Sequence, residues 1–267
     1  MGLFKRNPFG HILFIKRLLI LIFGAISHRR YRGFNELQID GSEIIKDLPP
    51  TNVLFIANHQ TYFADVAAMY HVFNASLNGR VDTIKNIGYL WNPKLNIYYV
   101  AAKETMTEGF LPKVFAYVGA ITVERTWRDK GRDVKRQVNL HDTENIKVAL
   151  DDGWVITFPQ GTTKSFKPVR KGTAHIIKQH KPIVVPIVID GFRRSFDRKG
   201  LRLKKKGILQ TFTIKPPMEI DYENDTIEEI VEKVALAIEQ HPSLLKVIPA
   251  EEKALQKELN KKRGWDY

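Results

Sequence analysis

Short apolar runs alternate with longer stretches of helical periodicity from residue 35 onward, and this alternation constrains the fold more than any other feature of the chain. The runs that have the length and composition of buried strands are residues 53–57, 97–102, 120–123, 154–158, 183–189 and 211–214. Helical patterns lie between them at residues 64–73, 111–118, 132–150 and 171–180. Near the end, Thr226 and Glu229 have the spacing of a capping box, which predicts a further helix that stops before His241-Pro242. The alternation predicts an α/β fold in which helices flank a mostly parallel or mixed central sheet.

The segment before this alternation is the most apolar part of the chain. Residues 11–27 carry Lys16 and Arg17 near the middle of an otherwise largely apolar run. The run is shorter than the ~20 residues of a membrane span, and each central cation costs about 3 kcal/mol in a bilayer. On a helical wheel the side chains that are not strongly apolar share one arc: Lys16, Arg17, Gly24, Ser27 and His28. This pattern predicts an amphipathic helix in the membrane interface, with its cations toward the lipid phosphates.

Two other interpretations of residues 11–27 stay open, a buried core helix and a cleaved signal peptide or true span. Arg29, Arg30 and Arg32 follow directly and oppose translocation. We therefore predict a basic, amphipathic, membrane-associating segment at residues 1–34 and one globular domain at residues 35–267. The expected attachment is monotopic, on the cytoplasmic face of the cell membrane.

The net charge of +13, from 42 Lys and Arg against 29 Asp and Glu, calls for an anionic partner. The excess is concentrated in residues 1–34, 164–181 and 193–206. No nucleic-acid recognition motif accompanies these segments, so we expect an anionic membrane surface and phosphorylated substrates rather than nucleic acid. The chain has no cysteine, which excludes a thiolate nucleophile and a cysteine-built metal site, and we expect no metal.

Polar residues follow several predicted strands, at the sheet edge where ligands bind in α/β folds. His59 comes just after residues 53–57, and Asp65 lies six positions later. A turn that folds Asp65 back would make the pair a general base and its orienting carboxylate, whereas the alternative is a helix cap beside an ordinary polar residue. Other strand ends carry Glu124-Arg125 and Pro159-Gln160-Gly161-Thr162-Thr163-Lys164, and Pro186-Ile187 follows the apolar residues 183–185.

These four motifs, together with Ala102-Lys103 and the Phe166-Lys167…Lys171-Gly172 segment, resemble the glycerolipid acyltransferase family typified by lysophosphatidate (1-acylglycerol-3-phosphate) acyltransferases. The resemblance covers about residues 54–191, keeps the family's order, and extends to an N-terminal membrane-associating helix. It implies a glycerolipid acyltransferase-like catalytic domain that moves a fatty acyl group from an acyl thioester to the hydroxyl of a lysophospholipid. The expected acceptor is 1-acyl-glycerol-3-phosphate, and acyl-CoA or acyl carrier protein would be a co-substrate, with no resident cofactor.

The resemblance also implies roles for individual residues. His59 would be the general base and Asp65 would hold its tautomer. Substrate-binding roles fall to Arg125, which would bind the acceptor's phosphate, and to Lys103, Gln160, Gly161, Thr162 and Lys164. Pro186 would shape the wall of the acyl pocket.

The sequence departs from the family pattern in two places. Five residues separate His59 from Asp65 where the family has four, so the loop must bulge or the helix must start later. The third motif usually contains Phe-Pro-Glu-Gly-Thr-Arg, and here Gln160 replaces Glu and Thr163 replaces Arg. Phosphate binding would then depend on Arg125, Lys103 and Lys164. A lysolipid without glycerol phosphate, such as an amino-acid-linked lipid, is an alternative acceptor, and an inactive lipid-binding or membrane-binding protein of the same fold is an alternative function. The oligomeric state is left open.

Overall fold

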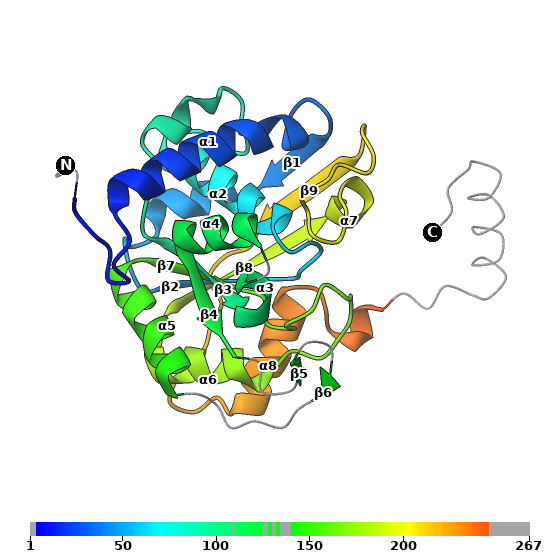
Figure 1. Cartoon of the computed structure of the whole chain (residues 1–267). Coiled ribbons are helices and arrows are strands. Elements are labelled where there is room, and N and C mark those ends of the chain that lie inside the picture. Colours follow the sequence, from blue (N-terminus) through cyan, green and yellow to red (C-terminus); the bar gives the residue numbers. More distant parts are fainter. Residues whose placement is uncertain (1–3, 108, 125–127, 130–131, 134–139, 246–267) are drawn as a thin grey trace, which may run out of the picture.

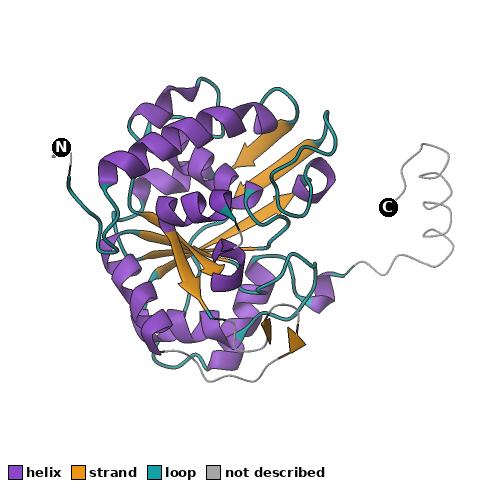
Figure 2. Ribbon diagram, in the orientation of Figure 1, coloured by secondary structure: helices purple, strands orange, loops and turns teal. Residues whose placement is uncertain are grey.

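A central seven-stranded sheet lies between two layers of helices (Figures 1 and 2). The computed structural model describes residues 4–107, 109–124, 128–129, 132–133 and 140–245. The strands of the central sheet are β1 (Glu36–Asp40), β2 (Val53–Ala57), β3 (Ile97–Ala102), β4 (Ala120–Val123), β7 (Trp154–Thr157), β8 (Ile183–Asp190) and β9 (Leu209–Ile214). A separate two-stranded ribbon pairs β5 (Arg128–Asp129) with β6 (Arg132–Asp133).

The strand order in the central sheet is β1-β9-β8-β2-β7-β3-β4. Strand β2 pairs in parallel with both β7 and β8, and β3 pairs in parallel with β7 and β4. Among the pairings described in this sheet, only that of β8 with β9 is antiparallel, and β1 pairs in parallel with β9. The predicted mixed, mostly parallel sheet is confirmed, and the carboxyl ends of β2, β3, β4, β7 and β8 therefore meet at one edge.

Each face of the sheet is covered by its own helices. On one face lie α1 (Leu13–Tyr31), α2 (Ala64–Leu77) and α4 (Phe110–Gly119), and on the other α5 (Leu140–Asp152), α6 (Lys171–His180) and α8 (Ile227–Ala237). In β2, Phe55 points into the first core and Ile56 into the second. Burial on both faces explains why this strand is apolar at every position instead of alternating. Short helices complete the fold: α3 (Lys103–Thr107), α7 (Phe192–Ser195), η1 (Ser42–Asp47), η2 (Ile87–Trp91) and η3 (Pro242–Leu244).

The structure differs from the prediction at strand β1 and at the start of helix α5. Strand β1 was not predicted, because its sequence ELQID is half polar and the strand forms an edge of the sheet with little burial. The helix predicted over residues 132–150 begins only at Leu140, and residues 132–133 belong to β6 instead. The capping box of Thr226 and Glu229 is present at the start of α8, as predicted. The charged tail after residue 245 lies outside the described residues.

Helix α1 packs on the body of the protein with its polar side inward. Lys16 is fully buried, and its Nζ donates to the carbonyl oxygen of Ile97 over 3.3 Å. The expectation that Lys16 faces lipid phosphates is therefore wrong, because the polar arc of the wheel is the side that docks on the protein. The exposed side of α1 is apolar and comprises Phe14, Ile15, Leu18, Ile22 and Ile26. No helix within the described ranges is long and apolar enough to cross a bilayer.

Candidate active site

The turn after β2 brings His59 and Asp65 into direct contact. His59 Nδ1 lies 2.8 Å from Asp65 Oδ2, and the His59 side chain is 13% exposed while that of Asp65 is fully buried. Because an ionised carboxylate only accepts hydrogen bonds, this contact assigns the ring proton to Nδ1 and the lone pair to Nε2. Among the described residues none hydrogen-bonds to Nε2. The arrangement is that of a general base held by an orienting carboxylate.

The buried Asp65 carboxylate is satisfied by the turn that carries His59. Backbone N–H groups of Gln60 and Thr61 donate to it over 2.6–3.1 Å, and the Thr61 hydroxyl donates to Oδ1 over 2.7 Å. These bonds offset the cost of burying a carboxylate. The sequence analysis did not single out Thr61 as a partner of Asp65. The available signal was a hydroxyl residue between His59 and Asp65.

The extra residue between His59 and Asp65 is accommodated by the loop that follows α7. The N–H groups of Tyr62 and Phe63 donate to the carbonyls of Arg198 and Lys199, at 3.2 Å and 3.0 Å. Gly200 has φ +76°, and a Cβ there would lie 2.6 Å from the backbone nitrogen of Ala64. Only glycine allows so close an approach, so this loop can support the first turn of α2, which begins at Ala64.

Two further side chains fix the position of His59, and neither was predicted. Asn58 exchanges two hydrogen bonds of 2.8 Å with the backbone of Ile189, which ties the end of β2 to β8. Phe158, directly after β7, stacks on the imidazole with ring centroids 3.8 Å apart and planes 20° apart. The parallel register of β2 and β7 brings Phe158 beside the histidine, and this neighbour relation is not visible in sequence.

The third motif forms a tight turn after β7. Gly161 has φ +63°, and its N–H donates to the carbonyl of Phe158 over 2.9 Å. Gln160 is buried, and its amide donates to the carbonyl of Lys167 and to the side chain of Gln240. In this structure Gln160 therefore braces the turn. Thr162 is partly exposed, and Lys164 is exposed.

The cations expected near β3 and β4 are described only in part. Lys103 begins α3 and pairs with Glu124 at 2.9 Å, where both side chains are exposed. The hydrogen bond to Glu124 raises the pKa of Lys103 above its ordinary value. Arg125 lies outside the described residues. Pro186 is buried within β8, opposite Ile56 of β2.

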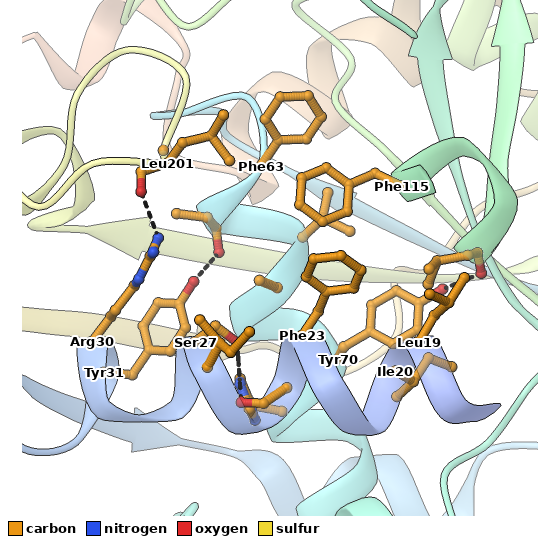
Figure 3. Close-up of a pocket in the computed structure, with 18 of the residues that line it drawn as sticks. Leu19, Ile20, Phe23, Ser27, Arg30, Tyr31, Phe63, Tyr70, Phe115 and Leu201 are labelled. Atoms are coloured by element: carbon orange, nitrogen blue, oxygen red, sulfur yellow. Dashed lines mark hydrogen bonds between the residues drawn. The ribbon is translucent and has the colours of Figure 1, made fainter. Parts of the chain in front are cut away.

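An apolar cavity of about 260 Å³ lies between α1, α2 and α4 (Figure 3). Phe115 packs at 5.0 Å against both Phe23 and Phe63, and these rings stand around the cavity in the close-up. Ala64, at the start of α2 next to Asp65, also lines it, and the Tyr31 hydroxyl donates to the Ala64 carbonyl over 2.7 Å. The residues that line the cavity do not include Pro186. Within the described part of the chain, no group of three or more His, Asp or Glu side chains is arranged to hold a metal ion.

Comparisons with known proteins agree with this architecture. A family model described as Acyltransferase matches residues 37–190. A 1-acyl-sn-glycerol-3-phosphate acyltransferase from Cocos nucifera is 26% identical over 240 residues, which are 88% of this chain and 64% of that protein. The chain thus spans less than two thirds of that relative's length.

The crystal structure of the 1-acyl-sn-glycerophosphate (LPA) acyltransferase PlsC from Thermotoga maritima is similar with a TM-score of 0.54 and 18% identity. The alignment covers 88% of this chain and 81% of that chain, and at such identity it supports the fold alone. The family model, in contrast, spans more than half of the chain and includes the His59–Asp65 turn and the third motif. The chain belongs to the acyltransferase family.

Proposed function

We propose that the chain transfers a fatty acyl group from an acyl thioester, carried by coenzyme A or acyl carrier protein, to the hydroxyl of 1-acyl-glycerol-3-phosphate, giving phosphatidate. The observation that carries the proposal is the 2.8 Å contact of His59 with Asp65 at the carboxyl edge of the sheet, which leaves Nε2 for a substrate. Family membership and the similarity to a 1-acyl-sn-glycerol-3-phosphate acyltransferase support the choice of chemistry and acceptor.

In the proposed step, His59 Nε2 accepts the proton of the acceptor hydroxyl while the oxygen attacks the thioester carbonyl carbon. The carbon–sulfur bond then breaks, and the imidazolium returns its proton to the leaving sulfur. Asp65 keeps the imidazole in the required tautomer and stabilises the imidazolium. The reaction balances with the two substrates alone, so we assign it no resident cofactor or metal. The Thr162 N–H is our candidate donor to the oxyanion, because the Gly161 N–H is already used within the turn.

The fatty acyl chain is assigned to the apolar cavity between α1, α2 and α4. Its walls are almost entirely aliphatic and aromatic, and Phe63 and Ala64 connect it to the turn that carries the base (Figure 3). An apolar chain gains about 0.8 kcal/mol for each CH₂ it buries. The cavity therefore offers a better acyl site than the buried Pro186 in β8, which we do not assign to the acyl wall.

We further propose that α1 lies on the cytoplasmic face of the cell membrane through its exposed apolar side chains. Phe4 and Trp91, which are 82% and 68% exposed, extend this apolar surface, and Trp91 is linked to α1 through a hydrogen bond from Arg17 to its carbonyl. Exposed cations at Lys5, Arg6 and Arg29 fit anionic headgroups. The helix would lie in the interface, with its buried polar side on the protein.

Acyl transfer to a panel of acceptors tests the proposed function. The purified chain is given a long-chain acyl-CoA or acyl carrier protein with 1-acyl-glycerol-3-phosphate, a phosphate-free monoacylglycerol or an amino-acid-linked lysolipid. We expect phosphatidate to be the dominant product, and His59→Ala to lower kcat by about 10²–10⁴. A preference for the amino-acid-linked lysolipid would contradict the assignment of 1-acyl-glycerol-3-phosphate as the acceptor. Absence of transfer to every acceptor would favour the inactive, lipid-binding alternative.

Sedimentation with vesicles tests the membrane assignment. Leu18→Asp with Ile22→Asp should strongly reduce binding to vesicles that contain anionic lipid, since both side chains are on the exposed side of α1. Leu236→Asp is the matched control, because Leu236 is an exposed leucine on α8, which covers the other face of the sheet. Equal binding of both variants would contradict the assignment.

A further inference from the structure

A polar pocket of about 340 Å³ lies beside the base, and the proposed function has not used it. Its lining residues are Gln60, Ser165, Asp190, Arg193, Arg194 and Lys204. They come from the turn after β2, the loop after β7, the end of β8, helix α7 and the loop that follows it. We call this space the β8 pocket. Since Gln60 is the residue next to His59, the pocket belongs to the same edge of the sheet as the catalytic pair.

The β8 pocket carries a surplus of positive charge. Arg193, Arg194 and Lys204 are exposed cations, and Asp190 is the one carboxylate among the lining residues. Arg194 donates to Asp190 over 2.8 Å, whereas the Lys204 ammonium has no hydrogen bond to any described residue. Three cations against one carboxylate leave a charge of +2. A phosphate monoester carries about −1.5 to −2 near neutral pH, so its charge complements the pocket.

The Asp190 carboxylate is engaged by the lining of the pocket. Partial burial alone would raise its pKa, but hydrogen bonds from the Gln60 amide, the Gly191 N–H and Arg194 hold the pKa below its ordinary value. The Gln60 amide in turn accepts a 3.1 Å bond from the Arg193 N–H. Gln60 thereby holds the backbone of Arg193, and Asp190 holds the side chain of Arg194.

Arg193 lies against the position where the third motif lacks its arginine. The guanidinium donates to the carbonyl of Thr163, which stands where the family pattern has Arg, and to the Ser165 hydroxyl at 3.4 Å. A guanidinium is therefore present at the third-motif loop although it comes from the segment after β8. A planar guanidinium can bind phosphate oxygens with two parallel hydrogen bonds, which an ammonium cannot do.

We propose that the β8 pocket binds the phosphate of the lysolipid acceptor, with Arg193 in place of the arginine absent at Thr163. The inference rests on the proposed function. In 1-acyl-glycerol-3-phosphate, the reacting hydroxyl and the phosphate ester are on adjacent carbons, so the phosphate must bind close to the base. The phosphates of coenzyme A and of an acyl carrier protein are separated from the thioester by the whole pantetheine arm. A phosphate site lined by the neighbour of His59 therefore fits the acceptor.

The position of the β8 pocket also distinguishes it from Lys103, one of the described cations that were expected to bind phosphate. Strand β2 lies between β8 and β7, and Lys103 follows β3, on the far side of β7. Lys103 is exposed and pairs with Glu124, which offsets its charge. The acceptor phosphate and Lys103 would then lie on opposite sides of the base.

Steady-state kinetics of Arg193→Gln and Arg193→Lys test the proposal. We expect Arg193→Gln to raise KM for 1-acyl-glycerol-3-phosphate about 10- to 100-fold, the loss typical of hydrogen bonds to a charged group. KM for the acyl thioester should be unchanged. The preference for 1-acyl-glycerol-3-phosphate over phosphate-free monoacylglycerol, measured as the ratio of their kcat/KM values, should decrease by the same factor by which the acceptor KM rises. Arg193→Lys should recover part of the loss, because it restores the charge without the fork of donors. The midpoint of thermal unfolding shows that each variant is folded.

Arg202→Gln is the matched control, since it removes an exposed arginine from the same loop without touching the pocket lining. An unchanged acceptor KM in Arg193→Gln, a rise confined to the thioester KM, or an equal rise in Arg202→Gln would each overturn the proposal. In those outcomes the wild-type protein still makes phosphatidate, and the proposed function stands. Failure of the wild-type protein to acylate 1-acyl-glycerol-3-phosphate would instead overturn the proposed function, and the acceptor role of the pocket with it.

Discussion

The turn after β2 and the interface between α1 and α2 each contain a histidine held through Nδ1, but the two rings have different surroundings. His59 meets the Asp65 carboxylate at 2.8 Å, is partly exposed, and has no partner at Nε2 among the described residues. His71 meets the Tyr89 hydroxyl at 2.8 Å and the Ser27 hydroxyl at 2.9 Å through its second nitrogen. Burial lowers the pKa of His71 to about 3, so it stays neutral in the folded protein.

This difference shows what separates the proposed catalytic histidine from a structural one. A base needs a free, solvent-accessible nitrogen and a partner that stabilises the charged ring, and the first region provides both. In the second region, the two nitrogens of His71 link α2 to Ser27 of α1 and to Tyr89 of η2, and the ring is buried away from water. The predictions below test this comparison, from the largest expected effect to the smallest.

Asp65→Asn should have the largest effect, lowering kcat by about 10²–10⁴. An amide at this position can present its NH₂ to His59 Nδ1, which favours the tautomer with the proton on Nε2 and removes the base. Steady-state kinetics at saturating substrates measure the change. Thr61→Val is the control, since it deletes one hydrogen bond to the same carboxylate but leaves its charge, and its kcat should stay within about tenfold. A kcat for Asp65→Asn close to the wild-type value would mean that the carboxylate does not orient the base.

The sequence predicted the His59–Asp65 pair and much of the sheet for physical reasons. Buried parallel strands are apolar on both faces, so runs such as residues 154–157 are visible, and polar residues at their ends face the functional edge. The capping box of Thr226 and Glu229 is a local signal and was confirmed. Edge strand β1 has no such pattern because only Ile39 is buried in it.

Other features depend on contacts between distant segments and have no local signal. The support of the longer His-to-Asp turn comes from residues 198–200, and the guanidinium at the third motif comes from Arg193. The orientation of α1 was predicted the wrong way round at Lys16, because a helical wheel identifies two faces but not which of them meets the protein. Lysine side chains are rarely fully buried, so the residue type favoured the exposed orientation that was predicted for Lys16.

His71→Ala should lower the free energy of unfolding by about 2–3 kcal/mol, because it leaves a cavity and two hydroxyl groups without their partner. Urea unfolding measures this loss. His59→Ala should cost less than about 1 kcal/mol, since that ring is partly exposed, while its kcat falls far more than that of His71→Ala. The comparison of the two regions would be wrong if both variants lost stability equally.

His71 should also make the free energy of unfolding decrease as the pH is lowered. The unfolded chain binds a proton at this residue below its ordinary pKa of 6.5, and the folded protein resists protonation until about pH 3. Between these values the unfolded state binds more protons, so the free energy of unfolding decreases as pH decreases, by about 2 kcal/mol from pH 7 to pH 5. His71→Gln removes the titration, and its unfolding free energy should depend less on pH over that range. Parallel curves for the two proteins would contradict the buried, neutral state of His71.

Lys16 provides the smallest and opposite effect in the same α1 interface. Burial lowers its pKa from 10.5 to about 7, with Asp152 acting in the other direction. Above pH 7 the unfolded chain keeps a proton that the folded protein releases, so the free energy of unfolding should rise with pH, by about 1 kcal/mol between pH 7 and pH 8. Lys16→Met should lack this rise, and Lys113→Met, at an exposed lysine of α4, should retain it. If Lys16→Met kept the rise, the lysine would have to be solvated, and α1 would have to sit on the protein less closely than the bond from Lys16 to Ile97 requires.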